Sequence, residues 1–207
     1  TTYLDTFPIF IKHISFKMAA TYIQDETFER TDFTLTSLEK GEYESCVFSG
    51  CNFSECDLSE FNFINCEFND CNLSLVKLNK TAFQDVKFSG CKLLGLQFDT
   101  CSDFGLSFSF ENCLLNHSVF YKKKIKNTSF KNSQLKEADF TECDLSNSLF
   151  DNCDLSGASF EFTNLEKADL RTAHNFSIDP EANRIRKAKF SLIGLPALLS
   201  KYDLSIE

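Results

Sequence analysis

The sequence predicts a solenoid built as one domain, and three features of the chain lead to that prediction. A large apolar residue recurs at every fifth position, from Phe28 to Phe98 and again from Phe110 to Leu170. The position two residues earlier holds mostly small or medium residues, and the other three positions are mostly polar. Helices repeat about every 3.6 residues and strands about every 2, so neither explains a period of five. A fixed short period over most of a chain indicates a solenoid.

Composition agrees with a single, narrow-cored domain. The chain has 207 residues and a formal net charge of −9, with 24 Phe, 7 Gly and 3 Pro. This length fits one domain, and so little Gly and Pro leaves no flexible linker. No apolar stretch reaches the ~18 residues that a membrane-spanning helix needs, so we expect no membrane association.

Residues 1–20 fall outside the repeat. Their apolar residues are interrupted by Lys12, His13 and Lys17, whereas a signal peptide would have an unbroken apolar stretch. We expect an N-terminal extension that is either a cap or a segment foreign to the natural protein, with Met18 as the alternative start.

The two runs of the repeat are out of phase. Phe98 and Phe110 are separated by two residues more than two repeats, which predicts a two-residue insertion within 99–109 and a small loop there. Phe108 fits the large position of the first run and the small position of the second, so it marks the switch.

Lys123 occupies a small inward position of the second run. A buried unpaired lysine is costly, so we expect a local distortion or an outward-pointing stem.

All ten cysteines fit the small inward position, Cys101 by extension of the first run. Cys51, Cys71 and Cys91 are 20 residues apart and would stack about 4.8 Å apart, within disulfide range but with poor torsions for one. We therefore predict buried free thiols in a reducing cytoplasm. A zinc site would need clustered ligands such as paired C-x₂-C motifs, so we expect no metal and no cofactor.

The tail, residues 191–207, predicts a short helical cap. Pro196 suits a first helical turn, and the many apolar residues are too numerous for a solvated tail. Capping of the solenoid end explains some of them, and a symmetric tail-to-tail dimer explains them better. The expected interface comprises Phe190, Leu192, Ile193, Leu195, Leu198 and Leu199.

Segments such as Cys51–Glu55, Cys143–Asn147 and Ala168–Thr172 resemble the pentapeptide-repeat family, whose consensus is A-(D/N)-L-x-x. The resemblance covers roughly residues 21–190. It implies an all-β fold, a right-handed quadrilateral parallel β-helix with four pentapeptides per coil. About eight coils would make a stack of ~38 Å at ~4.8 Å per coil.

A coil of four pentapeptides makes surface ladders. Glu111, Lys131, Asp151 and Arg171 would stack with alternating sign, each exposed pair contributing at most ~1 kcal/mol. Six acidic residues of the second half are expected to have fewer lysines and arginines beside them than the residues of this ladder have. They are either solvated or an anionic docking surface for a partner: Asp139, Asp144, Asp154, Glu161, Glu166 and Asp169.

The chain lacks the residue patterns of an enzyme. His13, His117 and His174 lie in unrelated places without a nucleophile beside them, and there is no phosphate-binding loop or metal motif. We therefore expect a non-catalytic protein.

Within the family, Cys66–Leu75 and Lys187–Leu192 resemble the quinolone-resistance (Qnr-type) and albicidin-immunity group. This resemblance implies a homodimer that mimics DNA, binds DNA gyrase or topoisomerase IV and protects it from inhibitors such as fluoroquinolones, without binding nucleic acid itself. A dimer ~75 Å long would carry twice the charge of −9, against roughly 45 charges on DNA of that length, so mimicry would be local. The alternative is a scaffold or regulator that binds another protein through a flat face.

Overall fold

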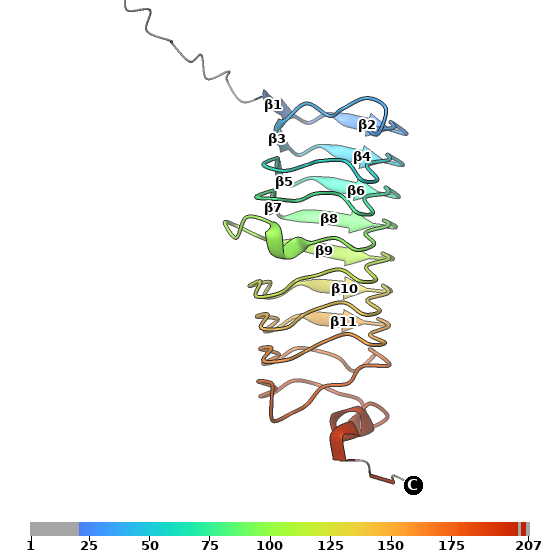
Figure 1. Cartoon of the computed structure of the whole chain (residues 1–207), viewed down its shortest axis with the longest axis vertical. Coiled ribbons are helices and arrows are strands. Elements are labelled where there is room, and N and C mark those ends of the chain that lie inside the picture. Colours follow the sequence, from blue (N-terminus) through green and yellow to red (C-terminus); the bar gives the residue numbers. More distant parts are fainter. Residues whose placement is uncertain (1–20, 203, 206–207) are drawn as a thin grey trace, which may run out of the picture.

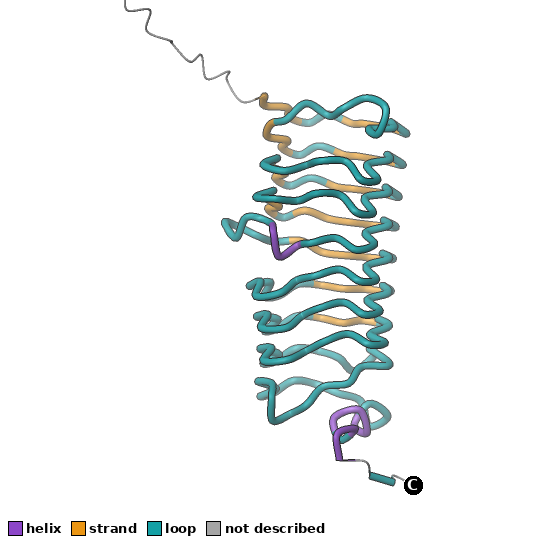
Figure 2. Tube along the Cα trace, in the orientation of Figure 1, coloured by secondary structure: helices purple, strands orange, loops and turns teal. Residues whose placement is uncertain are grey.

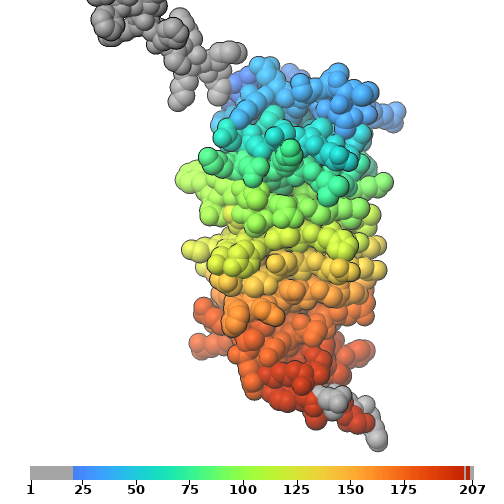
Figure 3. All heavy atoms as spheres, viewed as in Figure 1, coloured from blue at the N-terminus to red at the C-terminus, as the bar shows by residue number. Residues whose placement is uncertain are grey.

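The structure is a computed structural model that describes residues 21–202, 204 and 205, and it forms a rod of stacked coils (Figure 1). The fold is an all-β parallel solenoid of about seven turns. The period of five predicts the solenoid, and the family resemblance implies that it is all-β. The expected N-terminal extension lies outside the described residues. The space-filling view shows that side chains close the gaps between successive coils, so the visible face has little relief (Figure 3).

Two parallel sheets run along the rod (Figure 2). The first contains β1 (Thr21–Gln24), β3 (Gly41–Glu44), β5 (Asn62–Ile64) and β7 (Ala82–Gln84). The second contains β2 (Thr27–Glu29), β4 (Val47–Ser49), β6 (Glu67–Asn69), β8 (Val86–Ser89), β9 (Phe108–Glu111), β10 (Ser129–Lys131) and β11 (Leu149–Asp151). Isolated parallel bridges continue the stacking where no strand is assigned.

Successive coils pair at a spacing of 20 residues, as in Phe48↔Phe68 and Phe130↔Phe150, so each coil has four sides of five residues. We name the sides A to D in chain order by their inward large residues. Face A carries Phe28, Phe48, Phe68, Phe88, Phe110, Phe130, Phe150 and Leu170. Face B carries Phe33, Phe53, Leu73, Leu93, Leu115, Leu135 and Leu155. Face C carries Leu38, Leu58, Leu78, Phe98, Phe120, Phe140 and Phe160. Face D carries Ile23, Tyr43, Phe63, Phe83, Ile125, Leu145, Leu165 and Ile185.

Most corners are turned by a residue in the left-handed region, two positions after the large residue. Most are Asn, Asp, Glu, Lys or Gly, but Leu75 (φ 58°) and Phe162 (φ 54°) adopt it too. Non-glycine residues adopt this conformation at a cost. Hydrogen bonds between coils continue across the corners and stabilise them, for example from the Leu75 amide to the Leu94 carbonyl at 3.0 Å.

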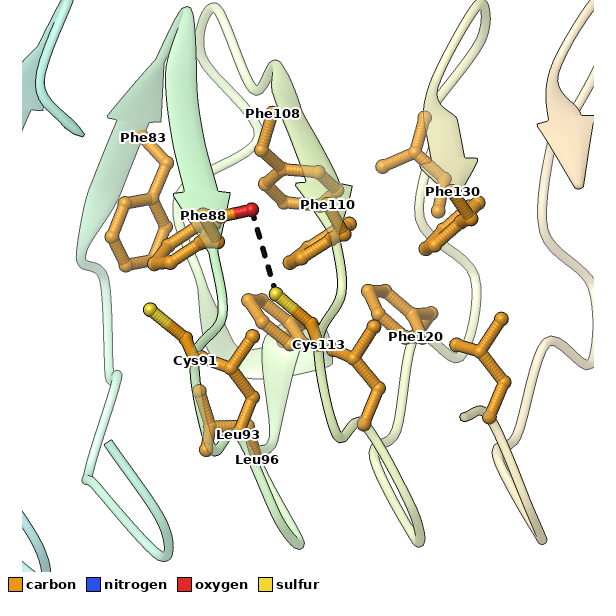
Figure 4. Packing of buried hydrophobic residues seen from close by; sticks show 14 of the residues in the cluster. Phe83, Phe88, Cys91, Leu93, Leu96, Phe108, Phe110, Cys113, Phe120 and Phe130 are labelled. Carbon is orange, nitrogen blue, oxygen red and sulfur yellow. Dashed lines mark hydrogen bonds between the residues drawn. The ribbon is translucent and has the colours of Figure 1, made fainter. Parts of the chain in front are cut away.

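The core is a set of stacked rings. On face A, Phe48 and Phe68 stack with centroids 4.7 Å apart, and Phe110 and Phe130 with centroids 5.2 Å apart. Offset stacking of this kind is favourable beyond the area it buries. Figure 4 shows Phe88, Phe110 and Phe130 in one row through successive coils, with Cys91 and Cys113 beside that row.

The small inward position explains the cysteines. The Sγ of Cys113 donates to the Phe88 carbonyl at 3.4 Å, and Cys71 donates likewise to Phe48 at 3.3 Å (Figure 4). Thr and Ser fill the same role elsewhere, as when Thr81 donates to the Leu58 carbonyl at 2.7 Å. All ten cysteines are free thiols and nine are buried, which confirms the prediction except at half-buried Cys56.

The predicted insertion is confirmed. Lys80 still bonds to Thr100 at the 20-residue spacing, whereas Val86 pairs with Phe108 two residues further on, so the extra residues lie between Thr100 and Phe108. A short 3₁₀ helix, η1 (Phe98–Thr100), precedes a loop over residues 102–107 that projects beside β7 (Figure 1). The loop occupies face D, and the sheet of that face ends at β7.

Lys123 does not behave as predicted. Its side chain is buried, and its Nζ lies 2.7 Å from the Cys101 carbonyl and 2.6 Å from Asp103 Oδ1. In this coil the loop offers face D only the half-buried Leu106, and Lys123 and Phe108 are buried in the interior. The lysine therefore has partners for its charge and ties the loop to the coil below.

The C-terminal end is less regular than expected. Phe176 and Ile178 are buried where the repeat would place Asn175 and Pro180, so the eighth expected coil is irregular. The predicted short helix is two 3₁₀ turns, η2 (Leu195–Leu198) and η3 (Ser200–Tyr202). Lys201 Nζ holds η3 to the last coil through Asp179 Oδ1 and Glu181 Oε2, both at 2.7 Å.

Candidate protein-binding surfaces

The six predicted partner-binding carboxylates lie on all four faces of the rod. Asp169 is on face A, Asp154 on face B, Asp139 and Glu161 on face C, and Asp144 and Glu166 on face D. The structure therefore brings only pairs of them together, on faces C and D, and does not assemble all six into one patch.

Four of the six have cationic partners, which corrects the expectation that they lack cationic cover. The pairs are Asp144–Lys126 at 3.2 Å, Asp154–Lys136 at 3.3 Å, Glu166–Arg184 at 2.8 Å, and Asp169 with Arg171 at 2.8 Å and Lys189 at 3.3 Å. Arg171 lies in the same pentapeptide as Asp169, but the other pairs arise because adjacent coils stack 20 residues apart, which brings charges distant in sequence within contact. Whether any of the six binds a partner stays a prediction.

The aspartates also stabilise the turns. Each precedes its large residue, and one carboxylate oxygen accepts the amide two residues ahead, at 2.8 Å for Asp139 to Thr141 and 3.1 Å for Asp144 to Ser146. The side chain of Arg171, the backbone amide of Arg171 and the side chain of Lys189 all donate hydrogen bonds to Asp169. These bonds lower the pKa of its carboxyl group to about 2. Burial opposes ionisation of Asp154, but bonds from Ser156 and Asn175 outweigh it and hold its pKa well below the ordinary value.

Face C of the second half is the remaining acidic surface. Asp139 and Glu161 have no ion pair among the described residues, and Glu142 beside them pairs with Lys122 at 3.5 Å. Asp179 and Glu181 extend the row at the C-terminal end. We call Asp139, Glu142, Glu161, Asp179 and Glu181 the face C acidic row. Sequence reasoning missed the row because it grouped the residues of face A by their place in the 20-residue coil but not these carboxylates.

Face C also carries an exposed aromatic side chain. Phe162 is 70 % exposed and lies beside a hollow of about 590 Å³ that is also lined by Phe160, Glu161, Ser177 and Asp179. The irregular last coil opens this hollow, so it could not be read from the repeat.

The six predicted dimer residues divide into two groups. Leu192 and Ile193 are 86 % and 93 % exposed, and Leu195 and Leu199 are partly exposed. Phe190 and Leu198 instead pack against the core, with the Phe190 ring 5.7 Å from that of Phe176. The exposed group forms an apolar end to the rod, and its role in a dimer stays a prediction.

Within residues 21–202, 204 and 205, no group of three or more His, Cys, Asp or Glu side chains is placed to hold a metal ion. No helix in that part of the chain is long and apolar enough to cross a membrane. His117 Nδ1 lies 3.3 Å from Glu137 Oε2 on the surface of face B, one more contact between coils.

Comparison with known proteins identifies the fold. The chain matches the pentapeptide repeat region family over residues 41–104 and 106–174, two segments that meet at the insertion. Two trypsin-treated variants of QnrB1, a plasmid-mediated fluoroquinolone resistance protein, share the fold with TM-scores of 0.59. They are 18 % and 17 % identical, and the match covers 91 % of this chain and 98 % and 100 % of theirs.

HetL, a pentapeptide repeat protein involved in heterocyst differentiation regulation from the cyanobacterium Nostoc sp. Strain PCC 7120, is 18 % identical with a TM-score of 0.37. The match covers 82 % of this chain and 85 % of HetL. No curated protein sequence matches the chain. Proteins of the matched family are generally non-enzymatic binding scaffolds. The sequence match covers more than half of the chain, and the chain belongs to the pentapeptide-repeat family.

Proposed function

We propose that this protein binds a type II topoisomerase, DNA gyrase or topoisomerase IV, by imitating DNA locally, and that it modulates the enzyme or protects it from inhibitors such as fluoroquinolones. The proposal places the protein in the cytoplasm as a homodimer that does not itself bind nucleic acid. It is supported by the resemblance of the sequence to the Qnr-type group and by a rod-shaped fold shared with QnrB1 at low identity.

The face C acidic row is the observation that carries the proposal. Asp139 and Glu161 lie one coil apart, and coils repeat about every 4.8 Å, so a basic groove meets carboxylates in a line along the rod. On face D of the second half, by contrast, Asp144 and Glu166 are both paired, with Lys126 and Arg184. A groove that binds DNA is basic, and attraction to this row weakens as salt rises.

The test is gyrase supercoiling, with and without a fluoroquinolone, in the presence of two double variants. Asp139→Asn with Glu161→Gln removes two unpaired charges of face C and keeps the side-chain oxygen of residue 139 that accepts the Thr141 amide. Asp144→Asn with Glu166→Gln removes the same charge from face D, where both carboxylates are paired. We expect the face C variant to lose its effect on gyrase and the face D variant to retain it.

Salt and linear DNA provide further readouts. Linear DNA should compete with the wild-type protein, and the effect should weaken with salt, because both ligands would use one basic groove. Equal loss in the two double variants would contradict recognition through face C. Absence of any gyrase or topoisomerase IV effect at micromolar protein would contradict the proposed function.

The tail-to-tail dimer has its own test. Leu192→Asp with Ile193→Asp alters two side chains that the rod leaves exposed, whereas a change at Leu198 would also disturb the core. We expect light scattering to show a dimer for wild-type protein and a monomer for the double variant or for a chain lacking residues 191–207. A wild-type monomer at micromolar concentration would contradict the dimer.

The alternative function is a scaffold or regulator that binds another protein through a flat face. The exposed ring of Phe162 beside its hollow favours this reading, because exposed aromatic side chains next to pockets are frequent binding anchors. If Phe162→Ala abolishes binding to a partner captured from the native host, and binding resists salt and DNA, the scaffold function is favoured.

A further inference from the structure

Face D changes charge along the rod. Its first half carries Asp25, Glu42, Glu44 and Asp85, and we call these residues the acidic half. None of the four has an ion pair within the described part of the chain; Glu44 accepts a hydrogen bond from Tyr22, and Asp85 from Ser107. Outward positions of face D in these four coils hold no lysine or arginine.

The second half of the same face is basic. We call Lys124, Lys126, Lys167, Arg184, Arg186 and Lys187 the basic half, and all six are exposed. Lys126 and Arg184 pair with the two carboxylates of this region, Asp144 and Glu166. The other four cations have no carboxylate partner among the residues that the structure describes.

The projecting loop lies midway between the two halves. Four inward residues of face D precede it, Ile23 to Phe83, and four follow it, Ile125 to Ile185. The loop takes the place of the fifth coil on this face, and Phe104 near its tip is 79 % exposed. A two-fold axis through the loop would therefore exchange the acidic half and the basic half.

Under such a rotation, two of the four pairs of coils oppose acidic to basic residues. The coil of Asp25 would meet the coil of Arg184, Arg186 and Lys187. The coil of Asp85 would meet that of Lys124 and Lys126, and the coil of Glu42 and Glu44 would meet that of Glu166 and Lys167, whose own charges cancel. The remaining pair of coils opposes Asn62 and Asn65 to Asp144 and Ser146; Asp144 is the one charge in this pair, and it is paired with Lys126.

We propose that face D is a self-complementary surface on which a second copy of this chain docks antiparallel, about a two-fold axis at the 102–107 loop. Symmetric dimers need one patch that complements itself, and face D does so in net charge: four carboxylates in the acidic half face six cations and two carboxylates in the second half. The two Phe104 rings lie next to each other at the axis, which shields an aromatic side chain that the single rod leaves in water. This association is independent of the topoisomerase proposal and uses a different face from the acidic row.

One face of the rod is narrow, so the complex belongs to the weak class of small, electrostatic interfaces. Its Kd should rise at least about tenfold between roughly 50 and 500 mM salt, because exposed charges are screened beyond about 4 Å at the higher value. The tail is a separate interface, so the experiment uses the full chain carrying Leu192→Asp and Ile193→Asp.

The experiment is a charge swap followed by sedimentation at tens of micromolar protein and low salt. The first variant reverses the basic half with Lys167→Glu, Arg186→Glu and Lys187→Glu. The second reverses the acidic half with Asp25→Lys, Glu42→Lys and Glu44→Lys. Each variant alone should be monomeric because like charges meet across the axis. Their mixture should form a heterodimer, since both halves of the swapped interface again have opposite charge.

A matched control is Glu111→Lys with Lys131→Glu, which exchanges opposite charges on face A and should leave the dimer unchanged. Circular dichroism checks that all variants remain folded. A parent chain that is monomeric at low salt, a reversed variant that still dimerises, or a mixture that stays monomeric would overturn the proposal. So would binding of a DNA duplex to the basic half that is tighter than self-association.

Discussion

The halves of the rod before and after the 102–107 loop share one backbone plan but fill it differently. In the first half, aromatic rings line faces A and D, as with Phe68 and Phe63; in the second, they line faces A and C, as with Phe130 and Phe140. The acidic surface moves in the same way, from face D to face C. The comparison teaches that the repeat fixes which positions point inward, while the type of inward residue and the surface charge of each face remain free to vary.

Core substitutions in the two halves should have the largest effects. Phe63→Ala and Phe140→Ala each remove a fully buried ring and should cost about 3–5 kcal/mol of unfolding free energy. Lys131→Glu, on the exposed surface between Glu111 and Asp151, should cost less than ~1 kcal/mol. Urea denaturation measures all three. Similar losses for Phe140→Ala and Lys131→Glu would mean that the inward and outward positions are wrongly assigned.

The junction between the halves should depend on Lys123. Lys123→Met keeps the length of the side chain but leaves the Cys101 carbonyl without its donor, and we expect a loss of about 1–2 kcal/mol. Lys124→Met changes an exposed neighbour and serves as the control. Thermal unfolding compares the two. Equal stability of both variants would contradict the role of Lys123 in holding the loop.

Acid should affect the more heavily paired second half first. The pKa of Asp169 falls from 3.8 to about 2 in the folded protein, so its ionised form stabilises the fold above pH 3.8 and this contribution is lost as the pH falls toward 2. Asp169→Asn should cost about 1 kcal/mol at neutral pH and flatten this dependence.

Asp57→Asn in the first half should cost less than Asp169→Asn, because Asp57 has no ion pair among the described residues. The measurement is the denaturant midpoint between pH 2 and pH 7 for the wild-type protein and both variants. A wild-type stability that does not fall with acid, or equal losses for the two variants, would contradict the prediction.

Thiol chemistry should show the smallest effect, a difference in rate without a change in stability. Cys56 in the first half is half-buried and should react first with a thiol reagent. In the second half, burial raises the pKa of the Cys143 and Cys153 thiols to about 12 and keeps them from ionising. Mass spectrometry of partially labelled protein identifies the order of reaction. Early labelling of Cys153 would show that the second half opens more readily than its packing indicates.

The repeat made the fold, the core and the insertion predictable, because a period of five assigns every position between Phe28 and Leu170 to the interior or the surface. The candidate surfaces were less predictable. Charges that meet in space are 20 residues apart, so Asp169 and Lys189 show their relation only when the outward residues are grouped by coil. The partners of Lys123 could not be predicted, because the loop that brings Asp103 to its side chain interrupts the repeat.

The loop also determines how the acidic surface follows the rod. A coil returns to the same direction after four corners, so five inserted residues turn everything downstream by one face, whereas two inserted residues are absorbed without rotation. With the insertion at its present length, the acidic surface lies on face D before the loop and on the neighbouring face C after it. One extra pentapeptide there would align the two acidic stretches into a continuous stripe and carry the basic half around to face A. The length of this one segment therefore sets the charge that a partner meets along each side of the molecule.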